Sequence, residues 1–438
     1  MGPNATHPDN AKSVTRNLRN LKPAAPLRSR YLYCNQMYTV ATHLVEETSG
    51  LSFPDFLEER FFVPLDMNST ALQPANAKSK GWGDRMAKGY IWENSAFRSF
   101  EPQDCPEAQG AGSVISSAND LIKWVKALLY QEGPINDRVY QGLTKMRSIV
   151  NPNAKKLKAH TTPANYTAGM EINYYRGNMV VGHDGNIPGF ASRFLFMPDL
   201  KFGAVVLGNS AGAGGASTTI MRALMDEVIG VPVEDRPSHN NNKRKENGSK
   251  KDLPIHPKSQ QADLKERQPK DQQPGQSEQS STDIQVESKP APQDQTPSKN
   301  QEKKNAKKEK RKETQQPEKQ KKQTEKPKKR EKSPPPQKTP LDAYVGTYWN
   351  AGYHNMTVEK RDDQLFINAT DRSMGFTMTF EHVKDQTEYI GHLKDDVELT
   401  DEPVDAEFVF KDGKAVKMGL DLEPAIKEMI WFTRDGGE

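Results

Sequence analysis

Three runs, NMVVGHDG (178–185), SRFLFMPD (192–199) and KFGAVVLGN (201–209), decide the fold of the first part of this chain. Each run is short and rich in β-branched or aromatic residues, as is typical of strands. The turn sequence Arg-Gly-Asn opens the first run, and Pro-Asp-Leu-Lys separates the second from the third. The runs therefore predict consecutive strands that are linked by hairpins and pair antiparallel.

Helical patterns precede and follow these strands. After the stretch YLYCNQMY, apolar residues recur at helical spacing until Gly50, a favoured C-cap residue. The sequences SFPD (52–55) and SAND (117–120) are N-terminal capping signals for two further helices. A last helix is predicted over Thr218–Ile229, ending at Gly230. Helices, hairpin-linked strands and a closing helix predict an α+β domain, an antiparallel sheet with flanking helices.

The end of the chain has a different pattern. Eight short candidate strands follow one another at close spacing after Leu341. They read GTYWN, HNMTVEKR, QLFINAT, FTMTFEHV, EYIGHL, AEFVFKDG, AVKMGLDL and MIWFT. Such spacing predicts a small all-β barrel or sandwich. The predicted division is an α+β domain over residues 1–235, a linker over 236–340 and this all-β domain over 341–438.

The linker 236–340 consists mostly of Lys, Glu, Gln, Pro and Ser, and it shows almost no apolar periodicity. Such a segment buries too little apolar surface to offset its conformational entropy, so it is predicted to be disordered. Its tract from Lys303 to Lys332 holds fifteen Lys and Arg against five Glu, a local net charge of +10, whereas the whole chain carries +4. A solubilising spacer is the expected role. The alternative is binding of an anionic partner such as nucleic acid, acidic lipid or a nuclear import receptor.

The two cysteines, Cys34 and Cys105, allow one disulfide, but two free thiols are expected. No apolar run reaches transmembrane length, and no signal peptide is visible. The sequence as written fits a cytoplasmic protein, and a secreted one is the alternative if the true N-terminus lies upstream. No residue set has the spacing of metal ligands, and no cofactor is expected.

Two short motifs carry the candidate chemistry: Tyr33-x-Asn35 before the first long helical pattern, and His183-x-Gly185 at the end of a strand. Each motif alone is common. A tyrosine before a helix is usually a packing residue, and a histidine at a strand end is usually a satisfied surface residue. Their order adds information, because FFVPLDMNST and GAGSVISSANDL lie between them and a hairpin ending in LGNS follows.

With these motifs in this order, residues 10–230 resemble the serine β-lactamase and penicillin-binding-protein superfamily. The resemblance is to the class C-like, peptidase S12-type branch, which includes esterases and D-amino-acid peptidases. Residues from Leu341 onward are similar to the lipocalin-like barrel that often follows this domain in its peptidase members. The resemblance implies acyl transfer from a small-molecule or peptide-like amide or ester to water, through an acyl-serine. β-Lactams, D-peptides, esters and thioesters all remain open as substrates.

The resemblance also implies roles for the motif residues. The Tyr33 hydroxyl would lie beside the nucleophile and pass its proton to the leaving group, which requires a pKa lowered by cationic neighbours. Asn35 would hydrogen-bond the catalytic lysine and the substrate amide. His183 would face the cleft and donate to the substrate carboxylate or to Tyr33. Gly185 would leave room for substrate along the strand edge. Cys34 is the variable middle residue, and we do not propose it as a nucleophile.

The same reaction needs a Ser-x-x-Lys pair, whose serine is acylated and whose lysine helps to deprotonate it. None of the serines in the 438 residues is followed by lysine three positions later. The nearest match is Ser13-Val-Thr-Arg16, in which arginine cannot act as a base because it stays protonated. We therefore expect the nucleophile segment to be missing from the chain as written, through a late gene start or a genuine truncation.

Three hypotheses follow. The first is a serine hydrolase domain that is inactive as written. The second is a non-catalytic binding protein, a pseudoenzyme that uses the cleft or the barrel. The third is a tethering protein that acts through the basic linker. An upstream reading frame that encodes Ser-x-x-Lys distinguishes the first from the second, and salt-dependent binding by the linker tests the third.

Overall fold

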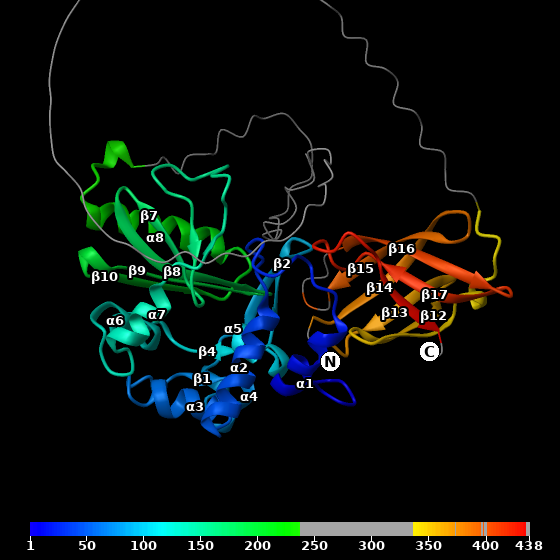
Figure 1. Ribbon diagram of the computed structural model, residues 1–438, viewed down its shortest axis with the longest axis horizontal. Coiled ribbons are helices and arrows are strands. Elements are labelled where there is room, and N and C mark those ends of the chain that lie inside the picture. Colours follow the sequence, from blue (N-terminus) through cyan, green and yellow to red (C-terminus); the bar gives the residue numbers. More distant parts are fainter. Residues whose placement is uncertain (237–335, 373, 396, 398–400, 435–438) are drawn as a thin grey trace, which may run out of the picture. The chain divides into compact units, whose positions relative to one another are not determined.

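The computed structural model describes residues 1–236, 336–372, 374–395, 397 and 401–434. An α+β domain is built from the first range, and an eight-stranded barrel from the others (Figure 1). Apart from its ends, the predicted linker 236–340, with its basic tract 303–332, lies outside the described residues. None of the helices in these ranges combines the length and the hydropathy that a membrane-spanning segment requires.

The α+β domain is organised around a six-stranded antiparallel sheet in the order β10-β9-β8-β7-β6-β5. The strands are β5 (Ser148–Ile149), β6 (Asn165–Tyr166), β7 (Glu171–Tyr175), β8 (Asn178–Ile187), β9 (Phe190–Met197) and β10 (Phe202–Gly208). Arg176 and Gly177, both with positive φ, form the tight turn between β7 and β8. The predicted strands and hairpin turns over residues 178–209 are therefore confirmed.

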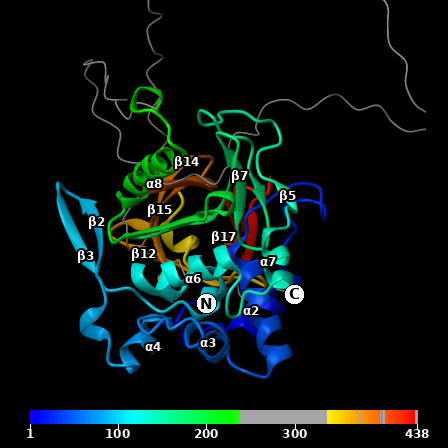
Figure 2. The same cartoon turned by 90° about the vertical axis from the view of Figure 1, so that its left-hand side faces the viewer.

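Two helices cover the two faces of this sheet, α6 (Ala118–Tyr130) and α8 (Ala213–Ile229) (Figure 2). The buried cluster under α6 contains Val125, Leu128, Ile172, Val181 and Phe196. The buried cluster under α8 contains Met221, Met225, Val180, Leu195 and Met197. Adjacent residues of one strand belong to different clusters, because successive side chains of a strand point to opposite faces.

Apart from the 15-residue helix α2, the remaining elements of this domain are short. The helices are α1 (Ala11–Asn17), α2 (Asn35–Ser49), α3 (Phe53–Leu57), α4 (Pro74–Ser79), α5 (Gln109–Gly112) and α7 (Asp137–Thr144). Strand β1 (Ala71–Leu72) pairs with β4 (Val114–Ile115), and β2 (Gly89–Glu93) pairs with β3 (Ala96–Phe100). A π-helical turn, Glu58–Phe62, follows α3, and 3₁₀ turns lie at Leu18–Asn20, Gly83–Arg85, Pro106–Ala108, Pro198–Leu200 and Val233–Asp235.

The predicted helix boundaries are confirmed at four places and wrong at one. The side chains of Ser52 and Ser117 accept hydrogen bonds at the starts of α3 and α6. Gly50 and Gly230 end α2 and α8 in the left-handed conformation. Helix α8, however, begins at Ala213 rather than at the predicted Thr218. Its glycine-rich first turns have low helix propensity, so packing against the sheet rather than local sequence sets that start.

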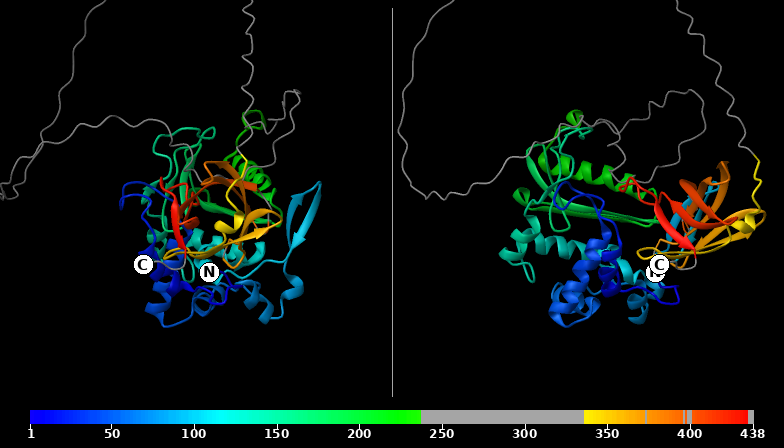
Figure 3. Two further views of the ribbon diagram at one scale, coloured as in Figure 1. Left: turned by 90° about the vertical axis from the view of Figure 1, so that its right-hand side faces the viewer. Right: turned by 45° about the vertical axis from the view of Figure 1, so that its right-hand side comes forward.

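The C-terminal domain is a closed antiparallel barrel, because β18 pairs with β11 (Figure 3). After a 3₁₀ turn at Leu341–Ala343, its strands are β11 (Gly346–Asn350), β12 (His354–Arg361), β13 (Gln364–Ala369), β14 (Phe376–Lys384), β15 (Glu388–Asp395), β16 (Asp401–Lys411), β17 (Lys414–Leu420) and β18 (Ile430–Arg434). All eight predicted strands are confirmed, and they form a barrel rather than the alternative β-sandwich. Its core includes the fully buried side chains of Tyr344, Tyr348, Met378, Phe408, Met418 and Phe432.

Candidate active site

Tyr33 and Asn35 lie at the start of helix α2. Cys34 is the N-cap residue of this helix, in an extended conformation with φ −150° and ψ 110°. The helix begins at Asn35, so Tyr33 belongs to the irregular segment before it, while Asn35 belongs to the first turn. Tyr33 is 46% exposed, so one side of its ring remains open to solvent.

His183 and Gly185 lie on strand β8, opposite Phe194 and Ser192 of β9. On its other side β8 is paired with β7, but this pairing runs only as far as Gly182. Residues 183–187 therefore extend past the end of β7, and that side of the strand is not paired with β7. Between the two motif residues, the carboxylate of Asp184 forms a two-pronged ion pair with the guanidinium of Arg193.

The structure brings the two motifs together. The ring of Tyr33 lies 6.3 Å from the ring of His183, centroid to centroid, with an interplanar angle of 33°. Tyr166, the last residue of β6, contacts both rings, at 6.1 Å from Tyr33 and 5.9 Å from His183. Tyr31 lies 5.2 Å from Tyr166. We call Tyr31, Tyr33, Tyr38, Tyr166 and His183 the tyrosine–histidine cluster.

Hydrogen bonds inside this cluster differ from the expected ones. His183 Nε2 lies 3.1 Å from the hydroxyl of Tyr166, and His183 Nδ1 lies 2.6 Å from the backbone carbonyl oxygen of Asp184. The Tyr38 hydroxyl donates to the Tyr166 hydroxyl at 3.1 Å. The structure thus pairs His183 with Tyr166, where the sequence suggested Tyr33. Tyr33 contacts the histidine through its ring.

Sequence reasoning missed Tyr38 and Tyr166. Tyr38 follows Asn35 by three residues, and this spacing places two residues of a helix on neighbouring positions of one face. That spacing could have marked Tyr38 as a candidate. Tyr166 belongs to a strand of two residues, too short to give a periodic pattern, so no local signal pointed to it.

The surroundings of Tyr33 raise its pKa. Burial is the largest cause, and Tyr38, Glu171 and Cys34 act in the same direction. Burial and the hydrogen bond with Tyr38 likewise raise the pKa of Tyr166. The lowered pKa that the resemblance implies for Tyr33 presupposes the nucleophile segment with its lysine; among the described residues, the groups that act on Tyr33 besides burial are a phenol, a carboxyl and a thiol. Tyr33 keeps its hydroxyl proton at neutral pH and is a hydrogen-bond donor.

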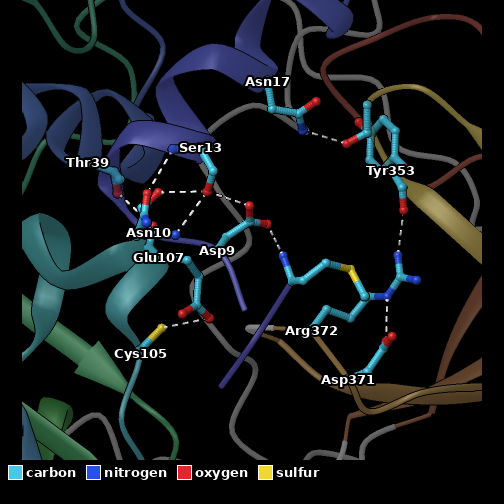
Figure 4. Close-up of polar contacts among 12 residues, drawn as sticks. Asp9, Asn10, Ser13, Asn17, Thr39, Cys105, Glu107, Tyr353, Asp371 and Arg372 are labelled. Atoms are coloured by element: carbon cyan, nitrogen blue, oxygen red, sulfur yellow. Dashed lines mark hydrogen bonds and ion pairs between the residues drawn. The ribbon is translucent and has the colours of Figure 1, made fainter. Parts of the chain in front are cut away.

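Ser13, the nearest match to a nucleophile, has its hydrogen bonds in the cap of helix α1 (Figure 4). Its backbone N–H donates to the side chain of Asn10, and its hydroxyl oxygen accepts from the backbone N–H of Asn10. The Ser13 hydroxyl donates to Oδ1 of Asp9 at 2.6 Å. These contacts form a capping box, which is a structural role.

Both cysteines are free thiols, as expected. Cys34 is exposed, whereas Cys105 is partly buried and its Sγ donates to Oε1 of Glu107 at 3.5 Å (Figure 4). Burial, together with this carboxylate, raises the pKa of the Cys105 thiol to about 12. In the part of the chain that the structure describes, no group of three or more His, Cys, Asp or Glu side chains is arranged to hold a metal ion.

Known proteins resemble both domains. Residues 2–224 match the family described as Beta-lactamase, and residues 329–434 match a domain of unknown function, DUF3471. The chain is 31% identical over 245 residues to an unguisins hydrolase of Aspergillus violaceofuscus, covering 51% of this chain and 42% of that protein. It is 25% identical over 226 residues to a D-aminopeptidase of Brucella canis, covering 51% and 39% respectively.

The chain thus spans about two fifths of the length of these curated relatives. Among solved structures, the octameric penicillin-binding protein homologue from Pyrococcus abyssi is 17% identical, with a TM-score of 0.43 over 96% of this chain and 70% of that one. The family match covers half of the chain and includes the motifs Tyr33-x-Asn35 and His183-x-Gly185. The chain therefore belongs to the beta-lactamase family, and its eight-stranded barrel is the DUF3471 domain that follows.

Proposed function

We propose that the α+β domain binds amides and peptides that contain a D-amino acid, and that the 438 residues by themselves do not turn them over. In this proposal Tyr33 and Asn35 occupy the catalytic positions of the family, while His183 and Gly185 contact the substrate. The name of one relative, a D-aminopeptidase, supports an amide substrate, and that of another, an unguisins hydrolase, supports hydrolysis. The reaction of a complete site would be acyl transfer from that amide to water through an acyl-serine.

The contact between Tyr33 and His183 is the observation that carries the proposal. It joins the start of α2 to the free end of β8, with the two rings 6.3 Å apart. An extended peptide can pair with residues 183–187 as an added strand, since β7 ends opposite Gly182. The protonated Tyr33 hydroxyl and the side-chain amide of Asn35 then lie at the start of α2 as hydrogen-bond donors.

The absence of turnover rests on two observations. No serine of the chain is followed by lysine at the third position, so the usual nucleophile pair is missing from these residues. Burial raises the pKa of Tyr33, which disfavours the phenolate needed to accept a proton from a nucleophile. Binding without hydrolysis is the function that these 438 residues support best.

The experiment compares binding with turnover in the full chain. D-alanine p-nitroanilide and its L-enantiomer serve as probes, with saturation-transfer NMR for binding and release of p-nitroaniline for hydrolysis. We expect saturable binding of the D-enantiomer, at least about tenfold weaker in His183→Gln, since loss of a contact with the imidazole ring worth about 1.4 kcal/mol is a factor of ten. No variant should release p-nitroaniline above background.

Tyr130→Phe is the matched control, because Tyr130 is an exposed tyrosine at the end of α6, outside the cluster. It should bind like the unmodified chain. Release of p-nitroaniline that disappears in Tyr33→Phe would refute the absence of turnover. Equal binding of both enantiomers, or binding unchanged in His183→Gln, would refute the site.

A tethering function through the basic tract 303–332 remains a prediction from composition alone. If the tract binds anions, the affinity of the full chain for heparin or for acidic vesicles should fall steeply with salt. A chain with the tract neutralised is the control. Binding that is weak and independent of salt would leave the tract as a spacer.

A further inference from the structure

The hydroxyls of Tyr38 and Tyr166 and the imidazole of His183 form one continuous chain of hydrogen bonds. Tyr38 lies in the second turn of α2, Tyr166 ends β6, and His183 lies on β8. The two O–O and O–N distances are both 3.1 Å, and the chain ends with His183 Nδ1 at 2.6 Å from the carbonyl oxygen of Asp184. Residues of three separate elements are thus linked in one chain of hydrogen bonds.

The protons of this chain have one consistent arrangement when the histidine is neutral. A backbone carbonyl can only accept, so His183 Nδ1 must carry the hydrogen that it shares with Asp184. His183 Nε2 then has a lone pair and must accept from the Tyr166 hydroxyl. The Tyr166 oxygen in turn accepts from Tyr38, whose single hydroxyl proton is used there.

We propose that Tyr166 is a positioning residue that holds His183 as the Nδ1–H tautomer, and that Tyr38 orients Tyr166 for this task. Tyr166 is 8% exposed, so water has little access to replace the bond that it donates. The imidazole is also held from its other side by the Asp184 carbonyl, which fixes the plane of the ring. The proposal depends on the proposed function in one respect, that His183 contacts the ligand.

The arrangement has a consequence for that contact. In neutral His183 both ring nitrogens are already bonded inside the protein, so the ring offers no N–H to a ligand. A proton added at Nε2 would be donated to the Tyr166 oxygen, so the Tyr166 hydroxyl would need another acceptor, and the Tyr38 oxygen lies 3.1 Å away. Tyr38 would then direct its own proton elsewhere. Protonation of the histidine would thus reverse the bond between Tyr166 and Nε2, and if the next bond reversed as well, the Tyr38 hydroxyl would become a donor on α2.

The test is ¹⁵N NMR of the histidine side chains in the full chain at about pH 9, above the ordinary pKa range of histidine. The signals of His183 are assigned among the nine histidines by their loss in His183→Gln. We expect the pattern of an Nδ1–H tautomer, with Nε2 unprotonated and hydrogen-bonded. Tyr166→Phe removes the donor to Nε2 and should therefore raise the share of the Nε2–H tautomer, the form favoured by free histidine, although the Asp184 carbonyl still favours Nδ1–H.

Tyr38→Phe is the paired control, because it leaves the Tyr166 hydroxyl able to donate to Nε2, and the Nδ1–H pattern should survive in it. An Nε2–H pattern in the unmodified chain would overturn the proposal. So would an unchanged pattern in Tyr166→Phe while circular dichroism shows an intact fold. The readout needs no ligand, so a failure of D-alanine p-nitroanilide to bind would reject the proposed function without deciding the tautomer.

Discussion

Replacing Gly182 by alanine should destabilise the pairing of β8 with β9 in the central sheet. The same change at Gly185, three residues along β8, should leave that pairing nearly unchanged. A Cβ added at Gly182 would lie 2.2 Å from the carbonyl oxygen of Phe194 and 3.0 Å from Cα of Leu195. Both are backbone atoms of β9, so the strand itself would have to move. At Gly185 the nearest atom is Oγ of Ser192 at 2.3 Å, the tip of a side chain that can turn away.

The expected costs follow from these distances. Overpacking that displaces a backbone costs about 1–3 kcal/mol, and we expect Gly182→Ala near the upper end, about 3 kcal/mol. At Gly185 a strained Ser192 rotamer costs about 1 kcal/mol, which the lower chain entropy of unfolded alanine offsets by about 0.5–1 kcal/mol. Ser192→Ala removes the obstructing oxygen and leaves Cβ of residue 192 at 3.6 Å, an ordinary contact. The double variant Gly185→Ala/Ser192→Ala should therefore show a favourable coupling of about 1 kcal/mol.

Hydrogen–deuterium exchange of peptides from β8 and β9 measures these costs in the full chain, with barrel peptides as an internal reference. A loss of about 3 kcal/mol corresponds to exchange roughly a hundredfold faster in Gly182→Ala. Gly185→Ala should change the rate by less than about fivefold. Equal exchange in the two single variants would refute the reasoning, because it would mean that backbone and side-chain obstructions at these positions cost the same.

Three further outcomes are expected. With maleimide at neutral pH, Cys34 should be labelled first and Cys105 on the order of a hundredfold more slowly. The reason is that burial and a carboxylate raise the pKa of Cys105 to about 12. Mass spectrometry gives the order of labelling, and similar rates for the two thiols would contradict the prediction. Asp120→Ala should destabilise the α+β domain by about 2–4 kcal/mol in urea unfolding. The buried carboxylate accepts hydrogen bonds from the backbone N–H of residue 69 and from the hydroxyl of Thr70, both at 2.7 Å. A loss of stability below about 1 kcal/mol would show that water replaces these bonds. Leu44→Gln should change the free energy of unfolding by less than about 0.5 kcal/mol and should reduce light scattering by concentrated protein, because Leu44 is 62% exposed on α2. A large loss of stability would mean that this side chain is covered.

Much of the fold could be predicted from the sequence because the deciding signals are local. Ser52 and Ser117 mark helix starts through a bond to a backbone N–H three residues later, and Gly50 ends α2 because it adopts a positive φ. Several barrel strands, β12, β14 and β16 among them, alternate between buried apolar residues and more exposed ones. Such patterns need no knowledge of distant parts of the chain.

Part of the candidate site could also be predicted, because Tyr33-x-Asn35 and His183-x-Gly185 each occupy three consecutive residues. The resemblance that they carry agrees with the family match over residues 2–224. The motifs by themselves gave no information on which groups surround them in the folded domain. The pKa of Tyr33 depends first on burial and then on Tyr38 and Glu171, which belong to α2 and β7 and come near the phenol only in the folded domain.

Tertiary structure alone decided the rest. Strands β1, β4, β5 and β6 have only two residues each, too few for a periodic pattern, and they are defined by their pairing with other strands. Closure of the barrel depends on the pairing of β11 with β18, which joins the two ends of that domain. Tyr166 meets His183 because the sheet aligns β6 with β7 and β7 with β8. A sequence encodes the conformations that neighbouring residues prefer. Contacts between distant residues form only when burial of the whole apolar core repays the entropy of bringing those segments together.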